Sequence, residues 1–283
     1  MVCWIWFFLC CSIVNASELI GGQVYNSGDT IEISGIGVSF QIPAKWLGGL
    51  VDGGEGTILL GSNTEGGMLT VLTTRTSSPK QLLAEFNQPM PLEDGVVLVP
   101  TTQPKMNGER LTIEYSVTMN GVPMAEAFAR MDGYIKTDGL GFGVLALGAS
   151  TAQQQLVGRQ QELISTTKFF VPKQPQELMG CWLNSDGYVS DGFSSTTSTK
   201  IVLEPSGRYQ YSSKVTASLS SVDSSGDWLG DSSAQTGDGV ETGTFYTIGN
   251  YVILQASDGE RVLSYKSVKS GVFFNNFRYS RCQ

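Results

Sequence analysis

The cysteines are the residues of this chain best suited to covalent chemistry. Cys3, Cys10 and Cys11 lie in an apolar N-terminal segment, whereas Cys181 and Cys282 lie far downstream. If the N-terminal segment is removed, one pair remains, which an oxidising compartment would join as a disulfide. Closing a loop of about 100 residues would contribute about 4 to 5 kcal/mol to stability in the chain-entropy model. Two separate buried thiols are the alternative interpretation.

Histidine is absent from the sequence. Without an imidazole, the chain cannot assemble a Ser-His-Asp triad, a Cys-His pair or a histidine-based zinc site. If both downstream cysteines are oxidised, no thiolate nucleophile remains. Catalysis by a carboxylate pair or by a Ser-Lys arrangement stays possible, although no spacing in the sequence points to either one. The sequence therefore nominates no catalytic residue, no metal site and no cofactor, and it predicts a protein that is not an enzyme.

Charge and composition narrow the classes of partner. The chain has 26 acidic and 18 basic residues, which gives a formal net charge of −8. Nucleic-acid binding depends on neutralising phosphates, so we expect no nucleic-acid partner. Charged residues make up only 16% of the chain and glycine occurs 34 times, which is typical of turn-rich β structure.

An apolar stretch opens the chain and carries no charged residue before Glu18. It is shorter than the roughly 20 apolar residues that cross a bilayer, and Ala16 supplies a small residue of the kind that a signal peptidase reads. We therefore predict a signal peptide over residues 1–16 and an exported protein, periplasmic or secreted. The alternatives are an uncleaved N-terminal anchor, through which alone the protein would contact a membrane, and a lipoprotein signal at Cys10 or Cys11.

The remaining chain is longer than one core usually organises, so two domains are expected. Pro172 and Pro175 mark an extended linker. We predict a first domain over residues 17–172, a linker over 173–176 and a second domain over 177–283.

The first domain alternates strand patterns with two helix patterns. Residues 30–43 read as a hairpin, and Asn120 with Gly121 supplies a further hairpin turn. Ser77 or Ser78 would cap a helix that begins at Pro79, and a second helix would follow residue 150. These patterns predict an α+β domain, in which a twisted antiparallel sheet carries flanking helices.

A strand that leads into a proline and a tryptophan opens this domain, at residues 38–46, which read VSFQIPAKW and end on Trp46. In this motif, and in its closing helix near residues 151–167, the segment 28–172 resembles the fold shared by the PsbP, Mog1 and DcrB families. That resemblance implies binding to other macromolecules rather than a reaction.

The second domain consists of short strand patterns at the spacing of an antiparallel meander, which predicts an all-β small antiparallel barrel. Gly180 and Trp182 on its first strand resemble the Gly-x-Trp signature of the lipocalin and calycin families. The resemblance implies that a basic residue of the last strand, Arg278 or Arg281, packs over the tryptophan and closes the barrel. It also makes a disulfide from Cys181 to Cys282 consistent with closure, because both lie beside these residues.

Residues 216–239 form a long segment that is rich in Ser, Gly and Asp, and we predict a loop there. A loop of this length is usually either functional or disordered. The functional interpretation is a flap over the barrel mouth, with Trp228 as a hydrophobic anchor for a partner. The structural interpretation is a solvated loop with that side chain tucked onto the barrel. Asp223, Asp227 and Asp231 suggest calcium but miss the ligand order of an EF-hand loop.

Three hypotheses for function follow. The leading one is an exported, non-enzymatic binding or assembly protein that recognises a protein or peptide partner. The first alternative is a carrier of a small apolar ligand inside the barrel, held by Tyr209, Tyr211 and Phe273. The second alternative is a hydrolase that uses a carboxylate pair.

Overall fold

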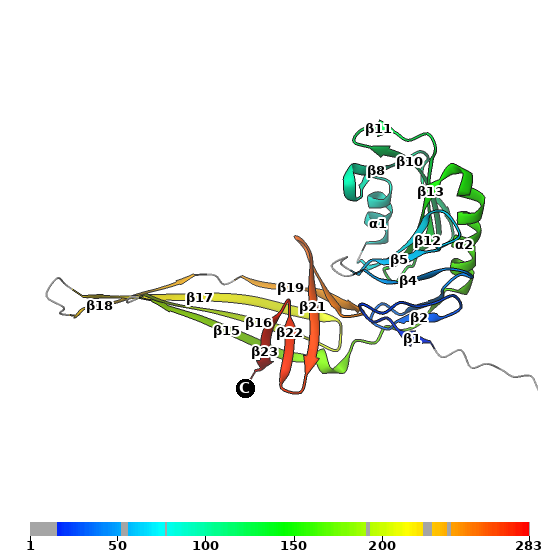
Figure 1. Ribbon diagram of the computed structural model, residues 1–283. Coiled ribbons are helices and arrows are strands. Elements are labelled where there is room, and N and C mark those ends of the chain that lie inside the picture. Colours follow the sequence, from blue (N-terminus) through cyan, green and yellow to red (C-terminus); the bar gives the residue numbers. More distant parts are fainter. Residues whose placement is uncertain are drawn as a thin grey trace, which may run out of the picture.

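The computed structural model describes residues 16–51, 56–76, 78–190, 193–222, 228–236 and 239–282. The predicted signal peptide lies almost wholly outside the described residues. Within them, the chain forms three β layers, of which the third follows the first two in the sequence (Figure 1). None of the helices described is long and apolar enough to cross a membrane.

The first layer is a four-stranded sheet made from both ends of the predicted first domain. Its strands are, in sheet order, β1 (Ser17–Glu18), β2 (Thr30–Ile33), β3 (Val38–Gln41) and β14 (Lys168–Phe169). β2 and β3 form the hairpin that the alternation over residues 30–43 predicts. Because Lys168 pairs with Ser39, the end of this region returns to its beginning.

The second layer is a ten-stranded antiparallel sheet. Its main path runs through β4 (Leu47–Leu50), β5 (Ile58–Gly61), β6 (Met68–Arg75), β13 (Leu140–Ala149), β12 (Ala127–Ile135), β10 (Arg110–Met119), β8 (Val96–Pro100) and β7 (Met90–Pro91). Two short strands, β9 (Lys105–Asn107) and β11 (Val122–Pro123), also pair with β10. Asn120 and Gly121 have φ angles of 50° and 80°, which is the backbone of the predicted hairpin turn.

Helices cover both faces of this sheet. α1 (Pro79–Phe86) begins with a proline, and the Ser78 side chain accepts a hydrogen bond from the Gln81 N–H, as a helix N-cap does. α2 (Gln153–Thr166) lies on the opposite face (Figure 1). Three short 3₁₀ turns complete the helical structure, η1 (Glu93–Gly95), η2 (Ser150–Ala152) and η3 (Gln176–Leu178).

The predicted α+β class of the first domain is wrong. The described residues hold 23 strands but only two α-helices, of 8 and 14 residues. Beside α2, the small four-stranded sheet covers the large sheet, and Phe40 of β3 packs 6.0 Å from Phe142 of β13 between ring centres. A second sheet therefore covers part of the large sheet where we expected helices. The protein is mostly β.

The third layer is a closed barrel of eight strands, as the meander pattern predicts. The ring runs through β16 (Phe193–Leu203), β15 (Gly180–Ser190), β23 (Phe277–Arg281), β22 (Gly271–Phe274), β21 (Gly259–Val268), β20 (Tyr251–Ala256), β19 (Val240–Ile248) and β17 (Arg208–Val222). Pairing between β16 and β17 closes it.

The barrel extends into a long, narrow arm (Figure 1). β15, β16 and β17 continue past the barrel, and β18 (Trp228–Thr236) pairs with the far part of β17. The prediction of a loop over residues 216–239 is therefore wrong, although residues 223–227 and 237–238 lie outside the described residues. Serine and threonine there alternate with Val, Ala and Leu, as in a strand. The backbone hydrogen-bonding groups pair with long partner strands, and composition alone does not reveal that such partners exist.

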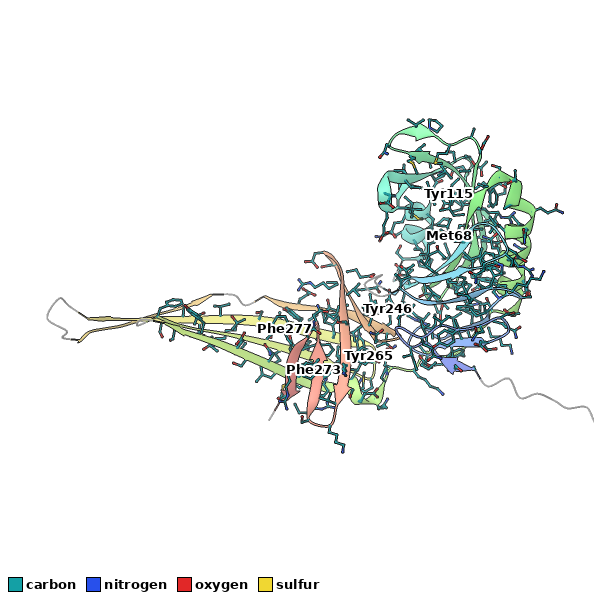
Figure 2. All side chains as sticks on the ribbon, viewed as in Figure 1. Met68, Tyr115, Tyr246, Tyr265, Phe273 and Phe277 are labelled. Atoms are coloured by element: carbon teal, nitrogen blue, oxygen red, sulfur yellow. A yellow bond between two sulfur atoms is a disulfide. The ribbon has the colours of Figure 1, made fainter. Side chains whose placement is uncertain are left out.

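One hydrophobic core crosses the predicted domain boundary. Tyr246, Ile248, Tyr251 and Ile253 of the barrel belong to the same buried cluster as Phe40 and its neighbours, and Tyr246 lies where the barrel meets the sheets (Figure 2).

Gln174, in the predicted linker, joins the two sides of this boundary. Its amide donates to the Gly35 carbonyl at 2.8 Å and accepts from the Thr247 hydroxyl at 3.2 Å. The domain division stays a prediction, and the linker itself is packed into the junction.

Candidate functional site

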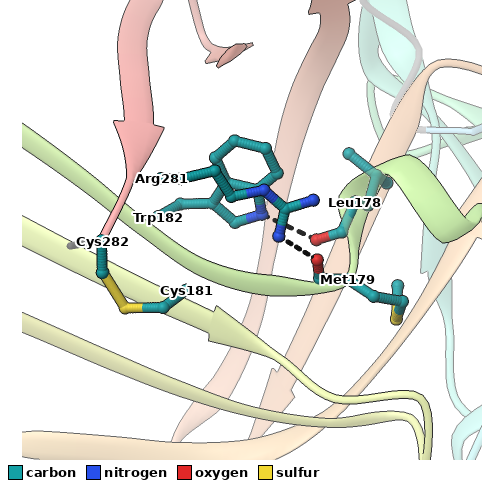
Figure 3. Close-up of a disulfide and its surroundings, with 6 residues drawn as sticks. All are labelled: Leu178, Met179, Cys181, Trp182, Arg281 and Cys282. Atoms are coloured by element: carbon teal, nitrogen blue, oxygen red, sulfur yellow. Dashed lines mark hydrogen bonds between the residues drawn. A yellow bond between two sulfur atoms is a disulfide. The ribbon is translucent and has the colours of Figure 1, made fainter. Parts of the chain in front are cut away.

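The predicted disulfide between Cys181 and Cys282 is present in the structure (Figure 3). The two Cα atoms lie 5.4 Å apart and 101 residues apart in sequence. The Cys282 N–H also donates to the Cys181 carbonyl at 3.0 Å. The bond thus ties the first strand of the barrel to the residue that follows its last strand.

Arg281 closes the same end of the barrel (Figure 3). Its guanidinium carbon lies 3.9 Å from the ring centre of Trp182, and its nitrogens donate to the carbonyls of Met179 and Glu177. The Trp182 indole donates to the Leu178 carbonyl at 2.7 Å. A cation stacked on a buried indole, with its donors satisfied, stabilises the closure.

Gly180 is favoured beside this arginine, because L side chains rarely adopt its backbone conformation. Its φ is +120°, and a Cβ at this position would collide with the Arg281 guanidinium. Of the two candidate arginines, Arg281 therefore takes the closing position. Arg278 lies on the outer face of the barrel, where it donates to the Ser270 hydroxyl at 2.9 Å.

The aromatic residues proposed as ligand contacts do not converge. Tyr209 is buried and donates to Glu241, and the barrel interior and that carboxylate raise the pKa of the phenol. Tyr211 lies beneath Arg261, at 5.2 Å from the guanidinium carbon to the ring centre. Phe273 alternates with the buried Val272 and Phe274, so it lies on the outer face.

Side chains fill the interior of the barrel. The buried cluster consists of Leu178, Met179, Trp182, Ile201, Leu203, Tyr209, Phe245, Val252, Leu254, Val272, Phe274 and Tyr279. The structure therefore gives no support to the hypothesis of a carrier with an internal apolar ligand. Trp228, the other proposed contact, opens β18, and its side chain lies outside the described residues.

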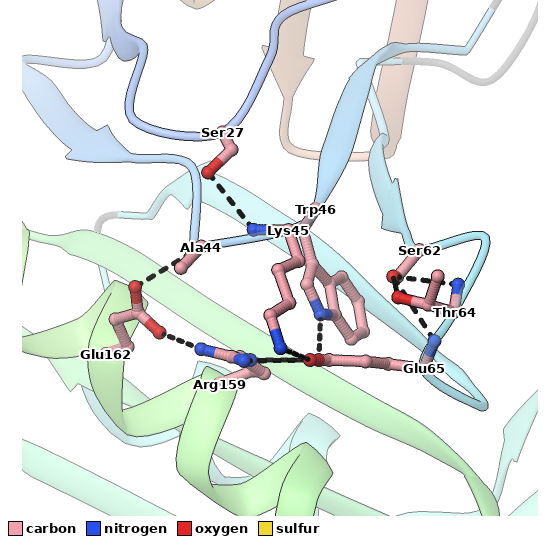
Figure 4. A network of polar contacts seen from close by, with 9 residues as sticks. All are labelled: Ser27, Ala44, Lys45, Trp46, Ser62, Thr64, Glu65, Arg159 and Glu162. Atoms are coloured by element: carbon pink, nitrogen blue, oxygen red, sulfur yellow. Dashed lines mark hydrogen bonds and ion pairs between the residues drawn. The ribbon is translucent and has the colours of Figure 1, made fainter.

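A buried ionic network that the sequence did not reveal fixes α2 to the start of the large sheet (Figure 4). The Glu65 carboxylate accepts from the Trp46 indole at 2.7 Å and from two nitrogens of Arg159 at 2.8 and 2.9 Å. These donors lower the pKa of Glu65 to about 2 despite its burial. Trp46 stands out in the sequence, but a single glutamate in a turn gives no signal.

A second buried carboxylate, Asp132, is also held by arginine. Arg110 donates to both of its oxygens at 3.0 Å, and Arg130 contacts it at 3.3 Å. Both carboxylates are thus paired with guanidinium groups, an arrangement that suits packing of the helix on the sheet better than proton transfer.

An apolar groove at one end of the large sheet is the best candidate for a functional site. Leu82 of α1 packs near Gly141, at the start of β13, whereas the groove lies at the other end of that strand. Because α1 is only 8 residues long, it leaves this end of the face uncovered. The groove has a volume of about 500 Å³, and its lining residues are Val96, Val117, Met119, Met124, Ala125, Glu126, Ala127, Leu147, Gly148 and Ala149.

The groove continues the core that lies beneath α1. Val117 belongs to that buried cluster, and Val96, Ala127 and Leu147 pack against it. Along each strand these residues keep the parity of the core-facing positions. The partial exposure of Val96, Ala127 and Leu147 therefore results from the lack of a cover rather than from a change of face.

Exposed apolar side chains gather along the β10–β11 hairpin, at the edge of the groove. Met119, Val122 and Met124 are 40%, 65% and 39% exposed. Unbranched methionines adapt to differently shaped apolar partners. Contiguous exposed apolar patches of this kind mark binding sites more often than single exposed apolar residues do.

No protein-family model matches the chain, and no curated protein matches it. Among solved structures, the chain is similar to the solution structure of cyanobacterial PsbP (CyanoP) from Synechocystis sp. PCC 6803. The two share 14% identity with a TM-score of 0.37, over 52% of this chain and 92% of the other. This is one of the families that the motif at residues 38–46 resembles, and we base no functional conclusion on so distant a likeness.

Proposed function

We propose that this protein is an exported, non-enzymatic binding protein that holds an apolar segment of a protein or peptide partner in the groove beside the β10–β11 hairpin. The observation that carries the proposal is the groove itself, a core-facing part of the large sheet that α1 leaves open. An apolar segment of a partner would complete the cover that the short helix begins.

Charge at the groove indicates what else the partner should carry. Glu126 is the charged residue among those that line it. Glu93 and Asp94 lie in the 3₁₀ turn directly before Val96, and the Gly95 carbonyl of that turn accepts from the Asn120 N–H at 2.9 Å. A partner with Lys or Arg beside its apolar residues would therefore be favoured over one with acidic residues there.

The disulfide supports export. Disulfides persist in oxidising compartments and are rare in the cytosol. Joining residues 101 apart, the Cys181–Cys282 bond stabilises the pairing of the first and last strands of the barrel. The disulfide thus supports the proposal of a periplasmic or secreted setting, which the predicted signal peptide also favours.

Peptide display tests the proposal without a known partner. Random peptides are selected on the full protein, and binding of the enriched peptides is measured by fluorescence anisotropy. We expect enrichment of apolar residues flanked by Lys or Arg. Met119→Glu should lose binding by at least about tenfold, because the apolar residues of the peptide would then have to bury a carboxylate at the position of the thioether.

Met106→Glu is the matched control. Met106 is 41% exposed, close to the 40% of Met119, but lies on β9 away from the groove. If the enriched peptides bind the Met119→Glu and Met106→Glu variants equally well, the groove is not the binding site and the proposal is wrong.

A further inference from the structure

The apolar groove lies on the face of the large sheet and not at one of its edges. Its lining residues belong to β8, β10, β12, β13 and the segment that follows β11. Within the described sheet, each of the four longer strands has a neighbour on both sides, because the order runs β6-β13-β12-β10-β8-β7. An extended peptide that adds a strand to a sheet needs a free edge, so strand addition does not suit this groove.

Neighbouring chain also satisfies the backbone where regular strand pairing ends. The Val117 carbonyl accepts from the Met124 N–H at 2.8 Å, and the Met124 carbonyl accepts from the Ala127 N–H at 3.0 Å. The Glu126 carbonyl accepts from the Ser150 N–H at 2.7 Å. An extended peptide laid over this surface would therefore bury N–H and C=O groups of its own without partners, which is costly.

An α-helix avoids this cost, because its backbone groups bond to one another. A helix, α1, already covers the neighbouring part of the same face (Figure 1). The end of α1 lies over β10, where the Tyr115 hydroxyl donates to the Phe86 carbonyl at 3.0 Å. Val117 is on the same side of β10, two residues or about 7 Å further along. The groove thus begins where α1 ends, and a second helix would continue the same layer.

The dimensions of the groove suit a short helix. The four strands span three spacings of about 4.8 Å, or about 14 Å. A helix is about 10 Å wide and rises 1.5 Å per residue, so about ten residues, or three turns, would cross these strands. Ala127 and Ala149 pair directly across β12 and β13 on this face. Their small side chains leave room for a large apolar side chain of the helix.

We propose that the occupant of the groove is an amphipathic α-helix of a protein partner, about three turns long, beside the end of α1. This inference rests on the proposed function, since it specifies the partner that the groove holds. Apolar residues of the helix at positions i, i+3 or i+4, and i+7 contact Val117, Met119 and Leu147. Lys or Arg on the flank of the helix faces Glu126.

The order of residues in the peptides selected by display tests the inference. We expect their apolar residues to recur at the helical spacing. Each enriched peptide is compared with a reordered peptide of the same composition, in which apolar and polar residues alternate as in a strand. The helical order should bind at least about tenfold more tightly. Circular dichroism of the mixture should show more helix than the sum of the protein and the free peptide.

Proline supplies a second comparison within one peptide. In the middle of a helix, proline removes a hydrogen bond and clashes with the preceding turn, so a central proline should weaken binding by about a hundredfold. Proline is compatible with the first helical position, and the same substitution there should change binding little.

Ala149→Trp is a second groove variant beside Met119→Glu. It changes an exposed residue of the groove, and the indole would occupy the space that the helix needs. We expect it to weaken binding of the helical peptides by at least about tenfold. Melting temperatures near that of the unsubstituted protein verify that both variants fold.

The outcomes separate this inference from the proposed function. Binding that both groove variants weaken, but that tolerates the central proline and the alternating order, would overturn the helix and leave the proposed function standing. Binding that the Met119→Glu, Ala149→Trp and Met106→Glu variants all retain equally would overturn both, because the peptides would then bind elsewhere.

Discussion

Glu65 accepts a hydrogen bond from the indole nitrogen of Trp46 at 2.7 Å, inside the protein. Arg159 of α2 donates two bonds to the same carboxylate. This one side chain thereby connects the segment that opens the large sheet to the helix that covers it.

Acid should weaken the protein through Glu65. Its folded pKa is about 2, against an ordinary value of 4.5. A depressed pKa means that the carboxylate contributes its full stabilisation above pH 4.5 and loses it as the pH falls toward 2. The shift corresponds to about 3 kcal/mol. Urea unfolding at several pH values across this window measures the loss.

Glu65→Gln should remove this part of the pH dependence and lower stability at neutral pH, since Arg159 then lacks its buried counter-charge. Glu114→Gln, at an exposed position on β10, is the control. If Glu65→Gln unfolds with the same pH dependence as the unsubstituted protein, the network does not hold the helix as we describe.

The closure of the barrel by Arg281 can be tested by substitution. Arg281→Ala removes the cation from Trp182 and leaves two carbonyls without a donor, so we expect a loss of about 2 kcal/mol in the free energy of unfolding. Arg278→Ala, at an exposed position on the same strand, should change stability by less than about 0.5 kcal/mol. Equal effects of the two substitutions would contradict the assignment of the closing residue.

Reduction of the disulfide should lower the melting temperature. In the chain-entropy model, opening a disulfide that closes a loop of about 100 residues lowers the free energy of unfolding by about 4 to 5 kcal/mol. Thermal unfolding followed with and without a reducing agent measures the effect. The Cys181→Ser, Cys282→Ser double variant should have the melting temperature of the protein with its disulfide reduced. Adding the reductant should not change the melting temperature of this variant. A reductant effect that persists in this variant would have another cause.

Local signals in the sequence predicted the barrel and its disulfide. Gly180 and Trp182 stand beside Cys181, and Arg281 stands beside Cys282, so short motifs at the two ends of one domain pointed to the same closure. The hairpin turn at Asn120 and Gly121 was predictable for a similar reason, because positive φ angles favour these residue types.

Long-range pairing decided the features that sequence reasoning missed. The spacing of Phe273, Phe277 and Tyr279 along the chain predicts that they share one face of a strand. Asn275 and Asn276 turn the chain between them, however, and parity does not carry across a turn. The groove likewise depends on how far α1 reaches along the sheet. No single segment carries that information, since each lining strand reads as an ordinary half-buried strand.

The shared core at the junction predicts that the barrel and the first two sheets stabilise each other. Ile248 of β19 is buried in the cluster that includes Phe40, whereas Leu254 of β20 is buried within the barrel. Ile248→Ala and Leu254→Ala should each cost about 2 to 5 kcal/mol. Hydrogen exchange distinguishes them: Ile248→Ala should speed exchange in β2 and β3 as well as in β19, and Leu254→Ala should act mainly on the barrel. If Ile248→Ala leaves exchange in β2 and β3 unchanged, the two parts fold as separate units.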